Sequence, residues 1–144
     1  MNTVFVDTIA WIALLNRSDA LHTPARDVLR SLHEQDARLV TTEFVLLEVA
    51  DVLALPATRT PLINLFNTLR QRSSMTLVTA SSALFAKGWA LYCQHSHMAW
   101  RLTHCTSFVV MSALGINDAF TCDPHFSEAG FTCLLAAPAD KARR

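Results

Sequence analysis

The chain has 144 residues, of which 51% are hydrophobic and 17% charged, with twelve basic and twelve acidic side chains. This length suits one domain with a sizeable core, and the composition excludes a disordered protein. The balanced charge gives no overall sign of nucleic-acid binding, although a local basic patch is compatible with it. So apolar a chain also predicts that a partner covers part of its surface, as a homodimer or a tight hetero-complex.

The longest apolar run covers residues 9–15. It is far shorter than the roughly 20 residues that a membrane helix needs. It also lacks the basic flank that precedes the apolar part of a signal peptide. We therefore expect a cytoplasmic protein without a membrane contact.

Short β-branched and aromatic runs predict five strands, near residues 3–8, 37–42, 75–80, 118–123 and 131–136. Between them, helices are predicted near residues 9–15, 22–35, 42–55, 62–72, 83–95 and 104–114, with a helical turn at 124–130. Strands that alternate with crossing helices form a parallel sheet between helix layers. The expected fold class is α/β, a three-layer α/β/α domain over residues 1–137 with a five-stranded, mainly parallel sheet. A flexible tail is expected at 138–144.

Hydroxyl side chains mark the expected starts of the helices. The predicted caps are Thr23, Thr42, Thr60, Ser81 or Ser82, and Thr103. Pro56 is expected to end the helix at 42–55, and Pro61 to occupy the first turn of the next one. Gly115 is expected just after the helix that begins near residue 104, where a left-handed residue commonly ends a helix.

Three acidic side chains stand in unusual places. Asp7 lies at the end of the first predicted strand and Asp123 at the end of the fourth, at the strand ends where parallel sheets bind ligands. Glu48 lies in an apolar helical segment, where a carboxylate needs a partner or an exposed edge. Each residue alone is explained more simply, as a cap or a solvated side chain. Their joint placement favours a shared acidic site.

Clustered carboxylates raise one another's pKa values and stay ionised only when a cation neutralises them. Oxygen ligands of this kind select Mg²⁺ or Mn²⁺. Such an ion activates water and stabilises charge during phosphodiester cleavage. The residues therefore predict metal-dependent hydrolysis of a phosphodiester, with one carboxylate as the general base.

Four segments, "VDTIAWIALLNRSDALH", "TTEFVLLEVADVL", "WRLTHCTSFVVM" and "AFTCDPHFSEAGF", occur in this order. In order and spacing they resemble the PIN-domain family, specifically the VapC-type toxin ribonucleases, over nearly the whole chain. The resemblance implies a compact α/β/α domain, four clustered acidic residues, Mg²⁺ or Mn²⁺, and cleavage of RNA. It also implies dimerisation and inhibition by a small antitoxin protein.

The resemblance places Asp7, Glu48 and Asp123 at the first, second and fourth acidic positions of the family. Thr8 and Ser107 match positions that often form hydrogen bonds near the metal.

The third acidic position is occupied by His104, in a Thr-His-Cys triplet where the family usually has Thr-Asp-Cys. A second departure is His97, near the place where the family commonly has an Asp-Lys pair before a tryptophan. Loss of one carboxylate beside a divalent ion weakens Mg²⁺ binding by about one to three powers of ten unless something compensates.

Three interpretations of His104 remain open. In the first, it is a metal ligand, and the mixed site prefers a softer divalent metal than Mg²⁺. In the second, the nuclease site has decayed, and the domain binds RNA or an antitoxin-like protein without cutting. In the third, His104 is protonated and replaces the metal with an ion pair. The expected catalytic and metal-binding residues are Asp7, Glu48, His104 and Asp123.

The function predicted from the sequence is thus a metal-dependent endoribonuclease, the toxin of a toxin-antitoxin pair. Its alternative is a catalytically impaired module that binds RNA or an antitoxin-like protein. A phosphoacceptor receiver domain is discounted, because such a domain needs an aspartate at the end of the third strand and "MTLVTAS" offers none.

Overall fold

The computed structural model describes residues 2–137, so the tail expected at 138–144 lies outside the described residues. The strands are β1 (Thr3–Val6), β2 (Arg38–Thr42), β3 (Met75–Val78), β4 (Asp118–Phe120) and β5 (Thr132–Cys133). They form one sheet in the order β3-β2-β1-β4-β5, and all neighbouring strands are parallel. The predicted α/β fold is confirmed, with a wholly parallel sheet.

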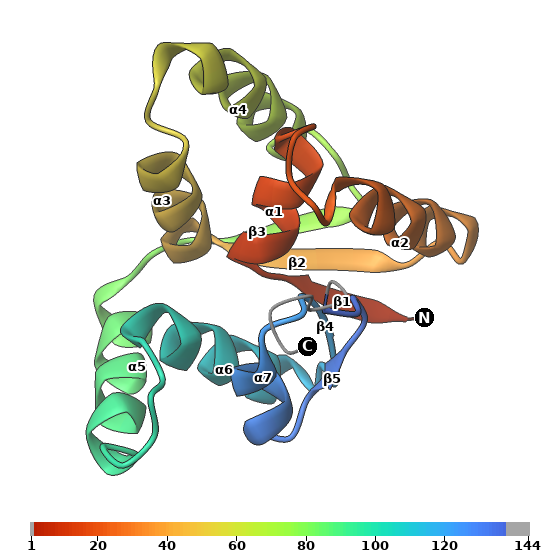
Figure 1. Ribbon diagram of the computed structural model, residues 1–144. Helices are drawn as coiled ribbons and strands as arrows, with labels where there is room; N and C mark the ends of the chain where they lie inside the picture. The colour runs from red at the N-terminus through yellow and green to blue at the C-terminus, as the bar shows by residue number, and fades with distance from the viewer. Residues whose placement is uncertain (1, 138–144) are drawn as a thin grey trace, which may run out of the picture.

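The helices are α1 (Thr8–Leu15), α2 (His22–Glu34), α3 (Glu43–Val52), α4 (Pro56–Leu69), α5 (Ser82–Gln94), α6 (Leu102–Leu114) and α7 (Pro124–Glu128). Helices α1 to α4 cover one face of the sheet and α5 to α7 the other, which gives the three layers (Figure 1). None of the helices within residues 2–137 combines the length and apolar character needed to cross a membrane.

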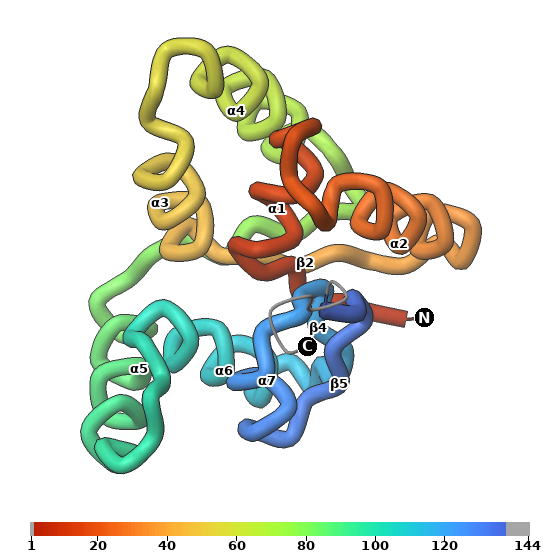
Figure 2. Tube along the Cα trace, viewed as in Figure 1, coloured from red at the N-terminus to blue at the C-terminus, as the bar shows by residue number. Residues whose placement is uncertain are grey.

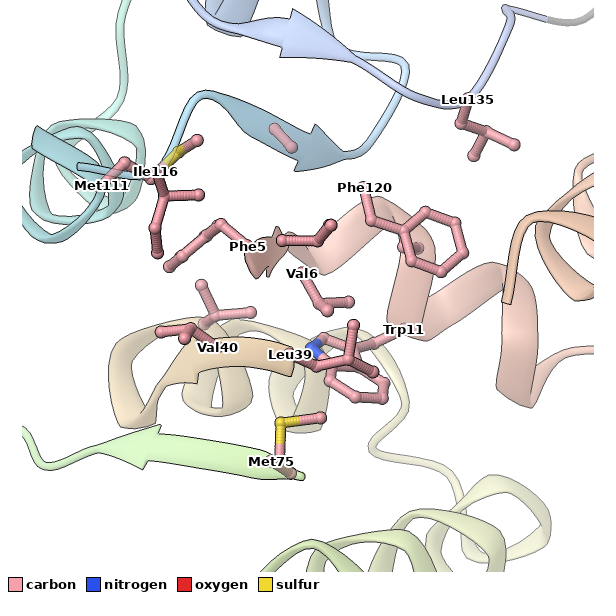
Figure 3. Close-up of a cluster of buried hydrophobic side chains, with 14 of the residues drawn as sticks. Phe5, Val6, Trp11, Leu39, Val40, Met75, Met111, Ile116, Phe120 and Leu135 are labelled. Carbon is pink, nitrogen blue, oxygen red and sulfur yellow. The ribbon is translucent and has the colours of Figure 1, made fainter. Parts of the chain in front are cut away.

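The centre of the core is β1, which has a paired strand on each side. Val4, Phe5 and Val6 are all fully buried, so this strand lacks the alternation of a half-exposed one. Such continuous apolar strands are typical of parallel sheets covered on both faces. Figure 3 shows Phe5 and Val6 between the neighbouring strands, close to Phe120 of β4 and Val40 of β2.

The order in which the chain adds strands to the sheet reverses at β1, although all the strands remain parallel. From β1 the chain proceeds to β2 and β3, and α5 and α6 then return it to β4 on the other side of β1 (Figure 2). In the β1–β4 register Val6 is opposite Phe120. The residues that follow these two therefore emerge side by side at the carboxyl edge, the position where open α/β sheets bind ligands.

Two of the predicted helix caps are confirmed and three are wrong. The Thr42 and Ser81 side chains accept hydrogen bonds from the third residue of their helices at 3.0 Å. The other three expected caps, Thr23, Thr60 and Thr103, lie inside their helices, which begin one or more residues earlier.

Proline explains the largest of these errors. Pro56 does follow the end of α3, but it also begins α4, because its fixed φ suits a first helical position. Pro61 therefore lies inside α4 instead of in its first turn. Gly115 does end α6 in the left-handed conformation, with φ 67°.

Helices α5 and α6 approach one another closely at Gly88. A Cβ atom at Gly88 would lie 2.5 Å from Cγ2 of Thr106. The missing side chain thus allows the contact between the helix that follows β3 and the helix that carries His104.

Candidate active site

Asp7 is the residue between β1 and α1. It adopts an extended conformation at the N-cap of α1, and its backbone N–H donates to the carbonyl of Phe120 at 3.3 Å. The side chain is only 3% exposed, and its Oδ2 accepts a hydrogen bond from Oγ1 of Thr121 at 2.9 Å. The strand-to-helix turn therefore buries this carboxylate at the carboxyl edge of the sheet, as predicted.

Burial raises the pKa of Asp7 from 3.8 to about 6. The hydrogen bonds from Thr121 and from the backbone of Thr8 oppose this rise, whereas the charges of Asp123 and Glu48 add to it. Glu48 and Asp123 are therefore close enough to influence the ionisation of Asp7. An added cation would offset both the burial and the mutual repulsion.

The Thr121 hydroxyl connects two of the acidic residues. Besides donating to Asp7, Oγ1 accepts the backbone N–H of Asp123 at 3.1 Å. Thr121 was not among the residues predicted for the site. Its position two residues before Asp123 was visible in the sequence, but its contact with Asp7 depends on β4 pairing with β1.

Asp123 lies three residues beyond the end of β4, and not in the strand as predicted. It is the N-cap of α7, and its Oδ1 accepts the backbone N–H of His125 at 3.0 Å. Its Oδ2 lies 2.9 Å from Nε2 of His104. Both carboxylate oxygens of Asp123 thus have hydrogen-bond partners.

Glu48 reaches the site from α3. Its Oε1 accepts a hydrogen bond from Oγ1 of Thr8 at 2.6 Å. Its Oε2 lies 3.6 Å from Nη1 of Arg101, whose side chain is 63% exposed. Glu48 also lines a hollow of about 310 Å³ between α3, α5 and α6, to which Asp51 and Phe85 contribute. This carboxylate thus has the partner and the exposed edge that its apolar helix requires.

His104 is the third residue of α6, and it is only 4% exposed. Its Nδ1 accepts the backbone N–H of Arg101, the N-cap residue, at 3.0 Å. Burial lowers the pKa of His104, and the Asp123 carboxylate opposes this effect without cancelling it. The structure thus brings His104 together with Asp123, as the sequence analysis expected of the third position.

Further polar groups surround this centre. Nδ1 of His125 lies 2.8 Å from Oε1 of Glu128, which also accepts the indole N–H of Trp100 at 3.2 Å. Hydrogen bonds from these two side chains lower the pKa of Glu128. His97 is exposed beyond the end of α5, with its ring 5.8 Å from that of His95.

The donor atoms of the site suit a hard divalent cation, since the carboxylates of Glu48 and Asp123 lie near that of Asp7 and all three offer oxygen ligands. Ser107, one turn after His104, is fully buried, and its hydroxyl has no hydrogen-bond partner among the described residues. Within residues 2–137, no three His, Cys, Asp or Glu side chains already form a group that could hold a metal ion.

The family model of the PIN domain matches residues 4–131. The chain belongs to the PIN-domain family. The α/β/α domain that the resemblance implied is confirmed.

Relatives of this PIN domain include the 23S rRNA-specific endonuclease VapC20 of Mycobacterium tuberculosis, from strains CDC 1551 and H37Rv. Each is 28% identical over 128 residues, which is 89% of this chain and 95% of the relative. The crystal structure of VapC20, described as a Sarcin-Ricin loop cleaving toxin, superposes with a TM-score of 0.80 at 26% identity. That match covers 92% of this chain and 98% of VapC20.

Two more distant structures share the fold. FitAcB from Neisseria gonorrhoeae has a TM-score of 0.60 at 15% identity, with 94% of this chain and 97% of that chain covered. VapBC2 from Rickettsia felis, bound to a DNA fragment from their promoter, has a TM-score of 0.64 at 11% identity, with 91% and 96% covered. At such identities the likeness concerns the fold alone.

Proposed function

We propose that this PIN domain is a metal-dependent endoribonuclease and the toxin of a toxin-antitoxin pair, acting in the cytoplasm. The observation that carries the proposal is the group of carboxylates at the carboxyl edge of the sheet. There the charges of Glu48 and Asp123 contribute to the raised pKa of Asp7. The similarity to VapC20, named as an endonuclease specific for 23S rRNA, supports RNA as the substrate class.

We propose Asp7, Glu48 and Asp123 as the residues that hold Mg²⁺ or Mn²⁺. When bound, such a cation supplies activation of water and neutralisation of phosphodiester charge. One of the carboxylates accepts the proton of the attacking water. The exposed guanidinium of Arg101, on the rim beside Glu48, is suited to contact an RNA phosphate.

The test is cleavage of a sarcin–ricin loop oligonucleotide and of an unrelated hairpin, with Mg²⁺, Mn²⁺ or EDTA. We expect cleavage of the first RNA with metal, and its loss in Asp7→Asn and Asp123→Asn. Asp27→Asn is the matched control, because Asp27 is exposed on α2 and forms an ion pair with Arg30 on the same helix. Cleavage that persists in EDTA or in both site variants would contradict the proposal.

One observation favours the alternative function, a module that binds RNA or an antitoxin-like protein without cutting it. His104 provides a nitrogen where the family provides an acid, so the site has three carboxylates instead of four. The variant His104→Asp separates the two functions. Activity in wild type and variant supports the nuclease, whereas activity in the variant alone supports the module.

We also propose a small antitoxin protein as a partner, supported by the toxin VapC20 among the relatives.

A homodimer is proposed from the surface of α5. Phe85, Trp89 and Tyr92 are 46%, 50% and 41% exposed and follow one face of this helix. Their rings stack in a row, with centroids 6.5 and 5.4 Å apart. This row carries no charge that a second copy of the chain would repel.

A further inference from the structure

We propose that His104 is a positioning residue that holds Asp123 through a hydrogen bond donated by Nε2, and that it is not itself a metal ligand. The part of this inference that concerns metal rests on the proposed function. The inference differs from all three interpretations drawn from the sequence, since it needs neither a ring–metal bond, nor a decayed site, nor a charged imidazole.

The partners of the two ring nitrogens determine where the proton lies. Nδ1 lies 3.0 Å from the backbone nitrogen of Arg101, which can only donate. Nε2 lies 2.9 Å from Oδ2 of Asp123, and an ionised carboxylate only accepts. Only the neutral ring with its hydrogen on Nε2 satisfies both contacts. A protonated ring would direct a hydrogen on Nδ1 at the N–H of Arg101.

Metal binding through Nε2 would need the opposite arrangement. The lone pair would have to be on Nε2, and the hydrogen would move to Nδ1, against the backbone N–H of Arg101. That state breaks the hydrogen bond at the start of α6 and the contact with Asp123 together. A buried donor without a partner is unfavourable, so the observed contacts oppose ligation.

The ring also has little freedom to turn over. Phe108 stacks on it, with centroids 6.1 Å apart and planes at 10°. Phe126 meets it edge-on, at 5.9 Å and 86°. Phe108 and Phe126 are themselves buried and pack against each other at 5.0 Å. The aromatic packing thus keeps Nε2 directed at Asp123.

The imidazole of His104 forms two hydrogen bonds, with the Arg101 backbone and with Asp123. A carboxylate at this position could form only the first. Either group accepts the N–H at the start of α6, as acidic side chains at this helix position commonly do. Only the imidazole donates to Asp123, whereas an aspartate at 104 would repel it. A hydrogen bond of this type orients a metal ligand while the donor itself stays unbound to the metal. His104 thus keeps Asp123 in place without adding a fourth carboxylate to the cluster.

The first test is the tautomer, read by long-range ¹H–¹⁵N correlation NMR of ¹⁵N-histidine-labelled wild type, with and without Mg²⁺. The chain has six histidines, and loss of one set of signals in His104→Gln assigns the ring. We expect a protonated Nε2 and an unprotonated Nδ1 in both samples. A doubly protonated ring, or a hydrogen that moves to Nδ1 when Mg²⁺ is added, would overturn the proposal.

The second test is Mn²⁺ affinity, measured by electron paramagnetic resonance. The amide of His104→Gln still donates to Asp123, so its affinity should stay within about threefold of wild type, whereas His104→Leu should lose about 10- to 100-fold. Equal losses in both variants, or ¹⁴N coupling from His104 to Mn²⁺, would show ligation and overturn the proposal. Absence of RNA cleavage would contradict the nuclease function but leave the NMR result to decide the role of His104.

Discussion

Replacement of Asp7 by asparagine should stabilise the metal-free protein. The pKa of Asp7 rises from 3.8 to about 6 on folding, chiefly because the side chain is buried. Each tenfold change in proton affinity corresponds to about 1.4 kcal/mol, so the ionised carboxylate destabilises the folded state by about 3 kcal/mol. Asparagine has nearly the same shape and still accepts the hydrogen bond of Thr121, but it carries no charge.

The sign of the pH dependence follows from the raised pKa. The folded state binds the Asp7 proton more tightly than the unfolded state, so this group favours folding below about pH 4. That contribution is lost as the pH rises through about 6. The advantage of Asp7→Asn over wild type should therefore be about 1 kcal/mol near pH 4.5 and about 3 kcal/mol near pH 7.5.

The assay is urea unfolding of both proteins across this pH range, with EDTA present to remove cations. Asp27→Asn is the surface control, and its free energy of unfolding should stay within about 0.5 kcal/mol of wild type. Added Mn²⁺ should reduce the difference in free energy of unfolding between Asp7→Asn and wild type, because a ligand that binds only the folded wild type stabilises it. An Asp7→Asn protein no more stable than wild type near pH 7.5, or a gap independent of pH, would refute the reasoning.

Three further predictions concern single contacts. Thr121→Val should lower the free energy of unfolding near neutral pH by about 1–3 kcal/mol, since it leaves a buried oxygen of Asp7 without its donor. Thr121→Ser keeps the hydroxyl and should retain most of the free energy of unfolding that Thr121→Val loses. Equal stability of the Val and Ser variants would contradict a role for this hydrogen bond. Gly88→Ala should cost about 1–3 kcal/mol in thermal unfolding because of the 2.5 Å contact with Thr106. Adding Thr106→Ser, which removes the contacting methyl group, should recover most of the loss, and no recovery would count against the close approach. Trp89→Glu should convert a dimer into a monomer in analytical ultracentrifugation, and an unchanged mass would argue against the α5 interface.

The strand and helix pattern was predictable because it is local. Short β-branched and aromatic runs separated by crossover helices identified the five strands, and the carboxyl edge of the sheet then brought Asp7 and Asp123 together. Helix starts were less predictable, because a proline fits both the end of one helix and the first turn of the next, as Pro56 shows.

The hydrogen bonds of the site could not be predicted from the sequence. Thr121 meets Asp7 only because β4 pairs with β1, and the strand order is a long-range property. The identity of His104 was visible, but its role depends on which atoms face its two nitrogens. Those partners, the Arg101 backbone and Asp123, are set by the start of α6 and by the loop after β4.

The central claim is that three carboxylates share one divalent cation at the carboxyl edge of the sheet. A crystal soaked in Mn²⁺, with an anomalous difference map at the manganese edge, tests it most directly. We expect one peak within coordination distance of Asp7, Glu48 and Asp123, with the His104 ring too far from the ion to coordinate it. A site without a peak, or a peak held by His104 without Asp7 or Glu48, would contradict it.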